Sequence, residues 1–355
     1  MRVRNLIPLA VAALALTACG GTDTPAASAP VPESVSAADL AKVTLKVGDQ
    51  KGGQKSYLEA AGLLKDLPYK IEWSTFTSGP PLLEAASAGA IDIGSVGNTP
   101  PLFAAAANAK IAVVSAQKGD VSSDTLLVPE SSPLRSIEEL RGKTIGVAKG
   151  SSAHGVVLSI LNRAKLAPTD VTLSFLQPAD AYAAFTQNKL DAWAVWDPYT
   201  TQALREAKAR VLIDGTGTIG GGKPDTEAGP DALTNGYGFL VAGRASLTDA
   251  GKNAALRDYV IRYAKALNYA KTHADERATA WAKDTGLKPE IALEASRRGL
   301  DRPIRIDDKV IADEQQLADA FIEAKILPTK FKFADFVDNR FAADVAAVAE
   351  SGAQK

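Results

Sequence analysis

From residue 43 onward, short apolar runs rich in β-branched residues alternate with stretches in which apolar residues recur every three or four positions. The first pattern predicts strands that are buried on both faces, and the second predicts helices that bury one side. The expected strands lie at 43–48, 70–76, 90–96 and 111–116, and the expected helices at 55–64, 80–88 and 100–108. Because strands alternate with helices, we expect a mostly parallel sheet with helices on both faces.

The same alternation starts again after residue 125. The second series has strands at 125–128, 144–148, 171–175, 191–195 and 211–213, and helices at 151–165, 179–188 and 198–207. A strand at 237–242 follows, and then a mainly helical tail whose clearest segments are 253–271, 275–283, 289–298 and 312–324. The restart indicates two α/β lobes, and the tail indicates a return to the first one. We therefore expect one lobe from 42–125 with 235–350, a second lobe from 126–234, and two crossovers between them.

The segment 215–230 between these parts is rich in glycine and contains a G-x-G-x-x-G pattern at 215–220. A dinucleotide site needs a helix to begin at that pattern. Here Gly221, Gly222 and Pro224 follow instead, which disfavours a helix. We therefore expect a loop over 215–230 and no cofactor.

Residues 1–18 have the pattern of an export signal. Arg2 and Arg4 precede an apolar run at 6–16, which is too short to span a bilayer. The run ends in Leu-Thr-Ala-Cys, which resembles the lipobox of bacterial lipoproteins, so Cys19 is expected to carry a lipid. The alternative is an ordinary secretory signal in which Cys19 is incidental. Residues 19–41, dominated by Gly, Ser, Thr, Pro and Ala up to residue 36, are expected to form a flexible tether.

Composition narrows the possible partners. The formal net charge is −1, and Lys and Arg are dispersed, which argues against a nucleic-acid partner. The single cysteine leaves no thiol nucleophile, disulfide or cysteine-based zinc site in the mature chain. We expect a monomer without a bound metal, exported and lipid-anchored at the extracytoplasmic face of the cell membrane or in the periplasm.

Four junctions share one pattern, in which a strand-like run breaks into a short polar turn and a helix begins. They lie at 77–80, 97–100, 149–152 and 196–198. Ser, Thr, Asn and Asp cap helix N-termini, and Pro suits the first helical position. Each such end carries unpaired backbone N–H groups and the positive end of the helix dipole. Four of them in one α/β chain predict a site for a small anion.

The residues at three of these helix starts form the expected anion cradle: Ser78, Gly79, Asn98, Thr99, Ser151 and Ser152. His154 follows in the first turn of the third helix and is expected to add a donor, although a partly buried helix residue is an equal alternative. A catalytic pair of Ser151 and His154 is a weaker third interpretation, since no orienting acid is evident.

The fourth junction is different because its cap is an acid. Trp193 and Trp196 should point to opposite faces of their strand, so one is expected in the core and the other at the cleft. Asp197 is most simply a helix cap, but its carboxylate is also expected to face the non-anionic part of a ligand. A tryptophan beside helix starts suits an organic anion with an apolar or cationic tail.

These stretches resemble the sulfonate/taurine/nitrate branch of ABC-importer solute-binding proteins, most closely the aliphatic sulfonate-binding proteins. The matching segments are 47–52, 78–80, 91–101, 150–154, 177–180 and 196–199. The resemblance implies a type II periplasmic-binding-protein fold, in which two α/β lobes joined by two hinge crossovers close on a ligand. It also implies delivery of that ligand to a permease and an ATPase. Two departures are Asp49, where such proteins often carry Tyr, and the Gly-rich loop, which looks like an insertion.

Together, these observations predict a receptor for a small organic anion, most simply an aliphatic sulfonate taken up for sulfur acquisition. Gln50, Trp196 and Asp197 are expected to face the organic tail, with Tyr237 closing one side. Taurine, nitrate or another small organic acid is the alternative ligand. An enzyme on the same fold is a further alternative, for which no paired acid–base set is evident.

Overall fold

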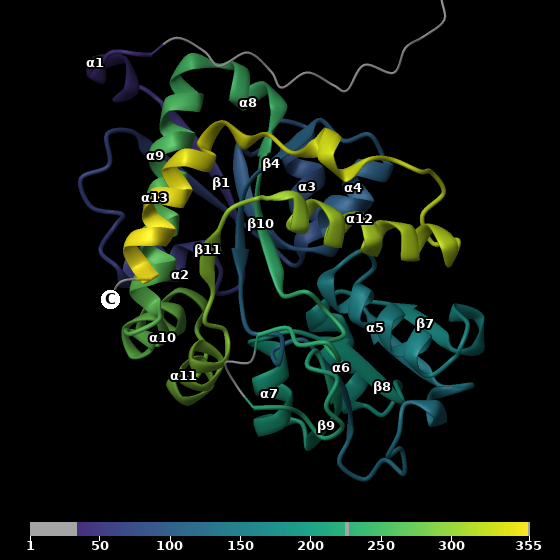
Figure 1. The fold of residues 1–355 in the computed structure, drawn as a ribbon. Coiled ribbons are helices and arrows are strands. Elements are labelled where there is room, and N and C mark those ends of the chain that lie inside the picture. The colour runs from purple at the N-terminus through teal and green to yellow at the C-terminus, as the bar shows by residue number, and fades with distance from the viewer. Residues whose placement is uncertain (1–33, 224–226, 354–355) are drawn as a thin grey trace, which may run out of the picture.

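The computed structural model describes residues 34–223 and 227–353. The expected export signal, the lipid site at Cys19 and much of the expected tether lie outside the described residues. Within them, the chain builds two sheets, each covered by helices (Figure 1). We call the part around the six-stranded sheet the first lobe and the part around the five-stranded sheet the second lobe.

The sheet of the first lobe has the strand order β11-β4-β10-β3-β1-β2. Its strands are β1 (Thr44–Gln50), β2 (Lys70–Phe76), β3 (Ile93–Gly97), β4 (Ile111–Lys118), β10 (Tyr237–Gly243) and β11 (Arg302–Ile304). Strand β1 is parallel to β2 and β3, whereas β10 runs antiparallel between β3 and β4. The chain thus returns to its first lobe through β10, as the sequence predicts.

The sheet of the second lobe has the order β7-β6-β8-β5-β9. Its strands are β5 (Thr125–Pro129), β6 (Thr144–Val147), β7 (Thr172–Phe175), β8 (Ala192–Val195) and β9 (Ala209–Asp214). Strand β6 is parallel to β7 and β8, and β5 is antiparallel to β8 and β9. In the first lobe β10 inside the sheet and β11 at its edge run against the other four strands, and in the second lobe β5 alone runs against the other four.

Helices cover both sheets. In the first lobe they are α1 (Ala37–Leu40), α2 (Gln54–Ala60), α3 (Gly79–Ser87), α4 (Thr99–Ala106), α8 (Arg244–Thr248), α9 (Ala250–Ala270), α10 (Ala274–Thr285), α11 (Pro289–Arg298), α12 (Asp308–Glu323) and α13 (Ala342–Ala353). In the second lobe they are α5 (Ser152–Arg163), α6 (Pro178–Thr186) and α7 (Tyr199–Glu206). Among the described residues, none of these helices combines the length and apolarity that crossing a membrane requires.

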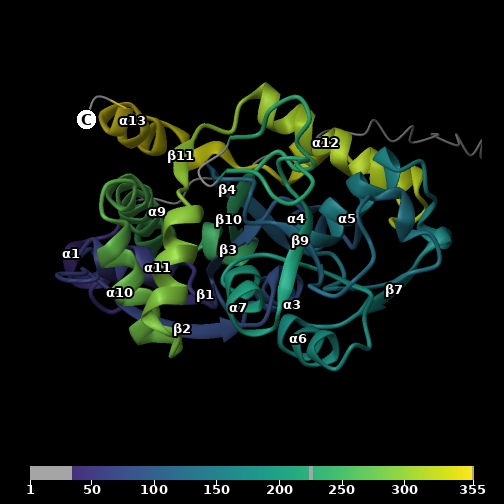
Figure 2. The same cartoon turned by 90° about the horizontal axis from the view of Figure 1, so that it is seen from below.

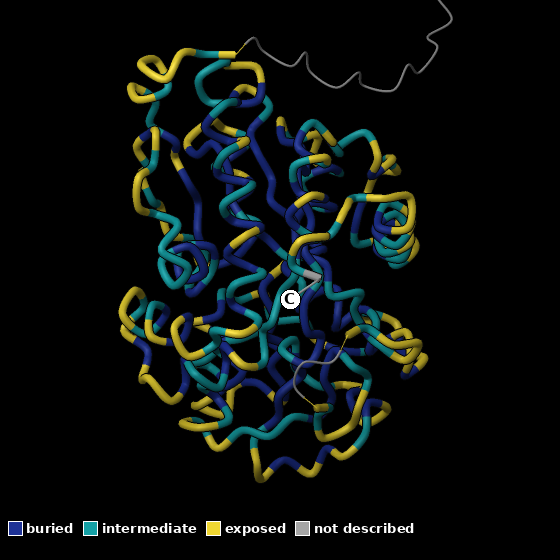
Figure 3. Tube along the Cα trace, turned by 60° about the vertical axis from the view of Figure 1, so that its left-hand side comes forward, coloured by how far each residue is buried: buried dark blue, intermediate teal, exposed yellow. Residues whose placement is uncertain are grey.

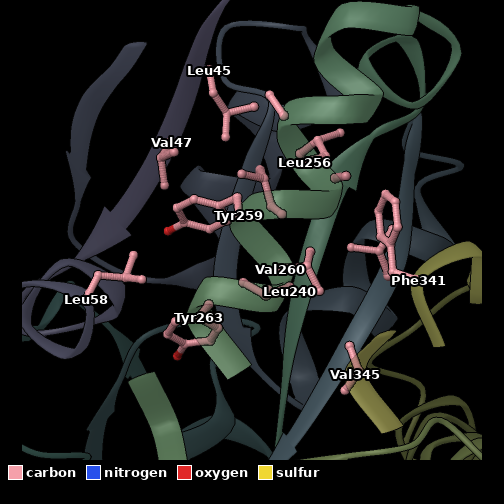
Figure 4. Packing of buried hydrophobic residues seen from close by; sticks show 14 of the residues in the cluster. Leu45, Val47, Leu58, Leu240, Leu256, Tyr259, Val260, Tyr263, Phe341 and Val345 are labelled. Carbon is pink, nitrogen blue, oxygen red and sulfur yellow. The ribbon is translucent and has the colours of Figure 1, made fainter. Parts of the chain in front are cut away.

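The core of the first lobe forms where the long helix α9 lies across the sheet. Tyr259 and Val260 of α9 pack against Leu45 of β1 and Leu240 of β10, and all four are essentially inaccessible (Figure 4). Burying a side chain of this size contributes about 1.5–3 kcal/mol. The buried backbone runs through the interior of both lobes, and exposed residues lie on outer loops (Figure 3).

Two crossovers connect the lobes, one from β4 to β5 and one from β9 to β10. They lie side by side, because the Gly119 N–H donates to the Gly236 carbonyl at 2.9 Å and the Gly215 N–H donates to the Asp124 carbonyl at 2.8 Å. Gly236 has φ +70°, and a Cβ there would come within 2.8 Å of the Gly119 carbonyl oxygen. The expected fold, two α/β lobes joined by two crossovers, is confirmed.

Candidate functional site

A cavity of about 210 Å³ lies between the two lobes, at the carboxyl ends of β1 and β3. We call it the cleft. Its lining includes Gln50, Gly79, Gly97 and Asn98 from the first lobe, Ser151, Ser152, Trp196 and Asp197 from the second, and Asp120, Asp124 and Tyr237 from the crossovers. The carboxyl edge of an α/β sheet is where such folds bind ligands. The starts of α3, α4 and α5 thus meet at one cavity.

At the start of α3, side chain and backbone have different partners. Ser78 is fully buried, and its Oγ donates to Oε1 of Gln177 at 2.9 Å, on the opposite lobe. Gly79 lines the cleft, and Pro80 and Pro81 carry no N–H. The donor that this helix start offers to the cleft is therefore the backbone N–H of Gly79, because the Ser78 hydroxyl is used across the lobes.

At the start of α4, Asn98 lines the cleft and is tied to the second crossover. Its Nδ2 donates to Oδ1 of Asn235 at 2.9 Å, and Oγ1 of Thr99 donates to its Oδ1 at 3.0 Å. Thr99 is fully buried and does not line the cleft. The polar groups of both side chains therefore bind protein atoms, which fixes the helix start relative to the hinge.

At the start of α5, both serines line the cleft. The Ser151 hydroxyl donates to the carbonyl of Ala148 at 2.7 Å, and the Ser152 hydroxyl donates to Oδ1 of Asp124 at 3.1 Å. Burial raises the pKa of Asp124 to about 7. A Cβ at Gly97 would lie 3.0 Å from Cβ of Ser152, so the lobes touch here. The N-terminus of α5 adds the positive end of a 12-residue helix to the cleft.

His154 lies on the side of α5 that faces away from the cleft lining. Its Nδ1 accepts the N–H of Gly150 at 3.1 Å, and its ring packs 5.4 Å from Phe175 and Phe321. Burial and, to a smaller extent, the charge of Lys149 lower its pKa to about 4, so the imidazole is neutral at pH 7. This placement differs from the expected ligand contact and matches the alternative, a buried helix residue. The Ser151 hydroxyl and His154 bind different partners, so they do not form a nucleophile–base pair.

Trp193 of β8 and Trp196, which follows that strand, lie in different environments, as the sequence predicts. Trp193 is buried in the core of the second lobe, and Trp196 lines the cleft. Asp197 also lines the cleft, but its Oδ1 accepts the N–H of Thr201 at 2.9 Å and it lies 3.4 Å from Nε of Arg298. Asp197 therefore caps the first turn of α7 and is balanced by a cation.

Gln50 at the end of β1 and Tyr237 at the start of β10 also line the cleft. Nε2 of Gln50 donates to the Ser95 carbonyl at 2.9 Å, and the Tyr237 hydroxyl donates to Oδ2 of Asp313 on α12 at 2.8 Å. Burial raises the pKa of Tyr237, so the phenol stays protonated. Both side chains are thus oriented by the protein itself.

Asp49 does not line the cleft, and its role in the structure is local. Its Oδ1 accepts the N–H of Gln54 at 2.8 Å, and its Oδ2 accepts the N–H of Lys55 at 3.0 Å. These are the first turn of α2. The acid that replaces the family's Tyr therefore caps a helix.

Sequence reasoning missed a group of cleft residues contributed by the helical tail and α2. They are Tyr57, Arg277, Trp281 and Asp301. The guanidinium of Arg277 lies 3.8 Å from the ring centroid of Tyr57 and 4.8 Å from that of Trp281. The one available signal was the i, i+4 spacing of Arg277 and Trp281, which places them on one face of a helix.

Known proteins match this chain along most of its length. A family model described as ABC transporter, phosphonate, periplasmic substrate-binding protein matches residues 58–213. A protein of Escherichia coli (strain K12) named as an aliphatic sulfonates-binding protein is 34% identical, over 83% of this chain and 88% of that one. The structure of the alkanesulfonate-binding protein SsuA from Xanthomonas axonopodis pv. citri, bound to MOPS, matches with a TM-score of 0.72 and 31% identity, over 83% of this chain and 98% of that one. SsuA from Escherichia coli matches with a TM-score of 0.68 and 32% identity, over 83% and 92% of the two chains. Fold, cleft and relatives agree: the chain belongs to the aliphatic sulfonates-binding family of periplasmic solute-binding proteins of ABC transporters.

Proposed function

We propose that this protein captures an aliphatic sulfonate outside the cytoplasm and delivers it to the permease and ATPase of an ABC importer. The observation that carries the proposal is the meeting of three helix N-termini, from both lobes, at one cavity that also contains Trp196. Helix starts supply N–H donors and positive potential to an anion, and the tryptophan supplies an apolar face to its tail. The names and the ligand of the relatives in the same family support this ligand class.

The donors for the sulfonate are backbone N–H groups rather than side-chain hydroxyls. The hydroxyls of Ser78, Ser151 and Ser152 donate to protein acceptors. The first N–H groups of a helix have no intrahelical acceptor, and neutral donors of this kind hold an anion without a paired cation. A sulfonate is ionised at any physiological pH, so burying it requires donors that replace its water. We therefore assign the cradle to the backbone at Gly79, Asn98 and Ser152, which all line the cleft.

The described conformation is closed, since groups from the two lobes bind each other around the cleft. Thr77 and Ser78 of the first lobe both donate to Oε1 of Gln177 on the second, at 3.0 and 2.9 Å. Lys288, which caps the start of α11, also forms an ion pair with Glu206 of α7, with 2.8 Å between Nζ and Oε1. A ligand that binds donors from both lobes shifts the open–closed equilibrium toward this form, which the permease then recognises.

We place the lobe boundaries at 125/126 and 234/235, and the lipid anchor on Cys19 after removal of residues 1–18. We also propose that the protein is a monomeric receptor and not an enzyme. The placement of His154 against phenylalanines, with its Nδ1 bound to a backbone N–H, supports a receptor.

Calorimetric titration of the purified protein tests the ligand class. The panel contains ethane-, propane- and benzenesulfonate as the candidate ligands. Taurine, nitrate and sulfate are included to represent the alternative ligand classes. We expect an alkanesulfonate to bind with a Kd below roughly 100 µM, which corresponds to about −5.5 kcal/mol. If nitrate or sulfate binds and no sulfonate does, the sulfonate proposal is wrong, and if none of these anions binds, the anion cradle is wrong as well.

A further inference from the structure

Asp124 is an acid of the first crossover that lines the cleft with only one hydrogen-bond donor of its own. It is half-buried, and the Ser152 hydroxyl donates to its Oδ1 at 3.1 Å. Among the described residues, no group donates to its Oδ2, and this oxygen is not one of the fully buried atoms that lack a partner. One carboxyl oxygen of Asp124 therefore remains accessible for a further contact.

The other acids that line the cleft have stronger partners. Asp120 accepts a backbone N–H at 2.7 Å, Asp197 accepts one at 2.9 Å, and Asp301 accepts a tyrosine hydroxyl at 2.9 Å beside the charge of Arg277. Asp124 has neither a backbone donor nor a neighbouring cation, and the charges that act on it are those of the acids Asp197 and Asp120. Of the four described acids, it is the least compensated.

The cations around the cleft bind other groups. The ammonium of Lys149 lies 5.7 Å from the centroid of one aromatic ring, and that of Lys51 lies 5.5 Å from another. Arg298 is paired with other acids, and the guanidinium of Arg277 stacks on aromatic rings. Arg277 belongs to α10, which lies on the opposite side of the molecule from α5 in Figure 1 and Figure 2. None of these described cations compensates Asp124.

The anion cradle adjoins this carboxyl. Ser152, whose backbone N–H we assign to the sulfonate, is also the residue whose hydroxyl binds Asp124. A sulfonate at the start of α5 therefore brings a second negative charge within the span of one residue from the carboxyl. A like charge at about 4–6 Å disfavours the ionised form of a carboxyl. An ionised Asp124 would repel the ligand, whereas a protonated Asp124 would not.

A protonated carboxyl also supplies a donor. One oxygen still accepts the Ser152 hydroxyl, and the other carries an O–H. A carboxylic acid that its surroundings keep neutral is an effective hydrogen-bond donor to an oxyanion. Burial, with smaller contributions from Asp197 and Asp120, raises the pKa of Asp124 to about 7, so the proton is available near neutral pH.

We propose that Asp124 binds the sulfonate in its protonated form, with its O–H donating to a sulfonate oxygen, so that capture of the ligand takes up one proton. The proton comes from the solvent, converts the carboxylate to a carboxylic acid and returns to the solvent when the ligand leaves. No bond of the ligand changes. The inference rests on the proposed function and adds a pH dependence to that same site.

Calorimetry of ethanesulfonate and propanesulfonate binding from pH 6 to pH 9 tests the proton uptake, because these ligands do not titrate in that range. We expect a Kd that is nearly constant below pH 7 and rises about tenfold between pH 8 and pH 9. At pH 8, binding enthalpies measured in Tris and in triethanolamine should differ by the amount that uptake of about one proton requires. These buffers carry no sulfonate that could occupy the cleft.

A constant Kd from pH 7 to pH 9, with equal enthalpies in the two buffers, would overturn the inference while the proposed function stands. Failure of both sulfonates to bind at every pH would overturn the proposed function and the inference together.

The variant Asp124→Asn assigns the proton to this residue. Its amide oxygen can still accept the Ser152 hydroxyl and its NH₂ can donate to the sulfonate, but it cannot ionise. We expect no proton uptake, a Kd that does not change between pH 7 and pH 9, and binding at pH 9 at least about tenfold tighter than in the wild type. Tighter binding than the wild type cannot come from a misfolded variant.

Asp180→Asn, at an exposed acid on α6 of the same lobe, serves as the matched control and should keep the wild-type pH dependence. Asp124→Ser, which also cannot ionise, should likewise bind without proton uptake. Wild-type pH dependence in Asp124→Asn or Asp124→Ser, or weaker binding than the wild type by Asp124→Asn at pH 9, would overturn the assignment to Asp124.

Discussion

Glu314 on α12 is a buried acid that binds the second crossover, and its ionisation should make the stability of the protein depend on pH. It is fully buried, its Oε1 accepts Nδ2 of Asn235 at 2.8 Å, and its Oε2 has no partner among the described residues. Asn235 in turn accepts Nδ2 of Asn98 at the start of α4. Burial raises the pKa of Glu314 to about 8, so the carboxyl is neutral at pH 7.

The perturbation is Glu314→Gln, which keeps the shape and the acceptor for Asn235 but cannot ionise. The folded pKa of Glu314 lies above its ordinary value of 4.5, so its stabilising contribution is fully present below pH 4.5 and is lost as pH rises toward 8. One pKa unit corresponds to about 1.36 kcal/mol, so the loss reaches about 3 kcal/mol at pH 7. Because glutamine does not ionise, the Glu314→Gln variant keeps this stability as the pH rises.

Urea unfolding of both proteins at pH 5 and pH 7 measures the difference. We expect Glu314→Gln to be more stable than the wild type by about 1 kcal/mol at pH 5 and about 3 kcal/mol at pH 7. Glu323→Gln, an exposed position on the same helix, should show no such pH-dependent gain. A Glu314→Gln variant that is less stable at pH 7, or whose gain is the same at both pH values, would show that Glu314 is not protonated in the folded protein at pH 7.

Three further changes follow from single contacts. The pKa of His154 is lowered to about 4, so its contribution to stability is present above pH 6.5 and is lost as pH falls toward 4. His154→Phe should therefore remove about 3 kcal/mol of the destabilisation that urea unfolding measures in acid. An unchanged acid profile would contradict this. Gln177→Ala removes the acceptor of Thr77 and Ser78, so small-angle scattering should show a larger radius of gyration without ligand; an unchanged radius would argue against this clasp. Asp49→Ala removes the cap of α2 and should lower the free energy of unfolding by about 1–2 kcal/mol, with sulfonate affinity retained; lost affinity would place Asp49 at the ligand.

Much of the fold could be predicted because the apolar periodicity is strong and local. The restart of the alternation after residue 125 predicted two lobes. The strand-like run that forms β10 (Tyr237–Gly243) and the helical tail after it predicted that the chain returns to the first lobe. Strand β11 (Arg302–Ile304) was missed because three residues carry no periodicity, and its pairing with β4 is formed by residues far apart in the chain.

The site was predictable only where one short segment carries it. Four polar junctions marked the helix starts, but the partners of their side chains lie elsewhere. The Ser78 hydroxyl was expected to face a ligand. It donates instead to Gln177, which lies 99 residues away in the chain, so the local sequence could not show that this hydroxyl already has a protein acceptor. Arg277 and Trp281 were missed for the same reason, because a helical pattern fixes neither the position of the helix nor the face toward the cleft. The sequence therefore showed which residue types stand at the helix starts, but not which distant side chains the folded chain brings against them.

A crystal structure of the protein with 2-bromoethanesulfonate tests the backbone cradle for the sulfonate directly, because bromine scattering marks the tail. We predict sulfonate oxygens about 3 Å from the backbone nitrogens of Gly79 and Ser152, with the bromine toward the indole of Trp196. A sulfonate bound at the guanidinium of Arg277, with the bromine among the helix starts, would contradict it.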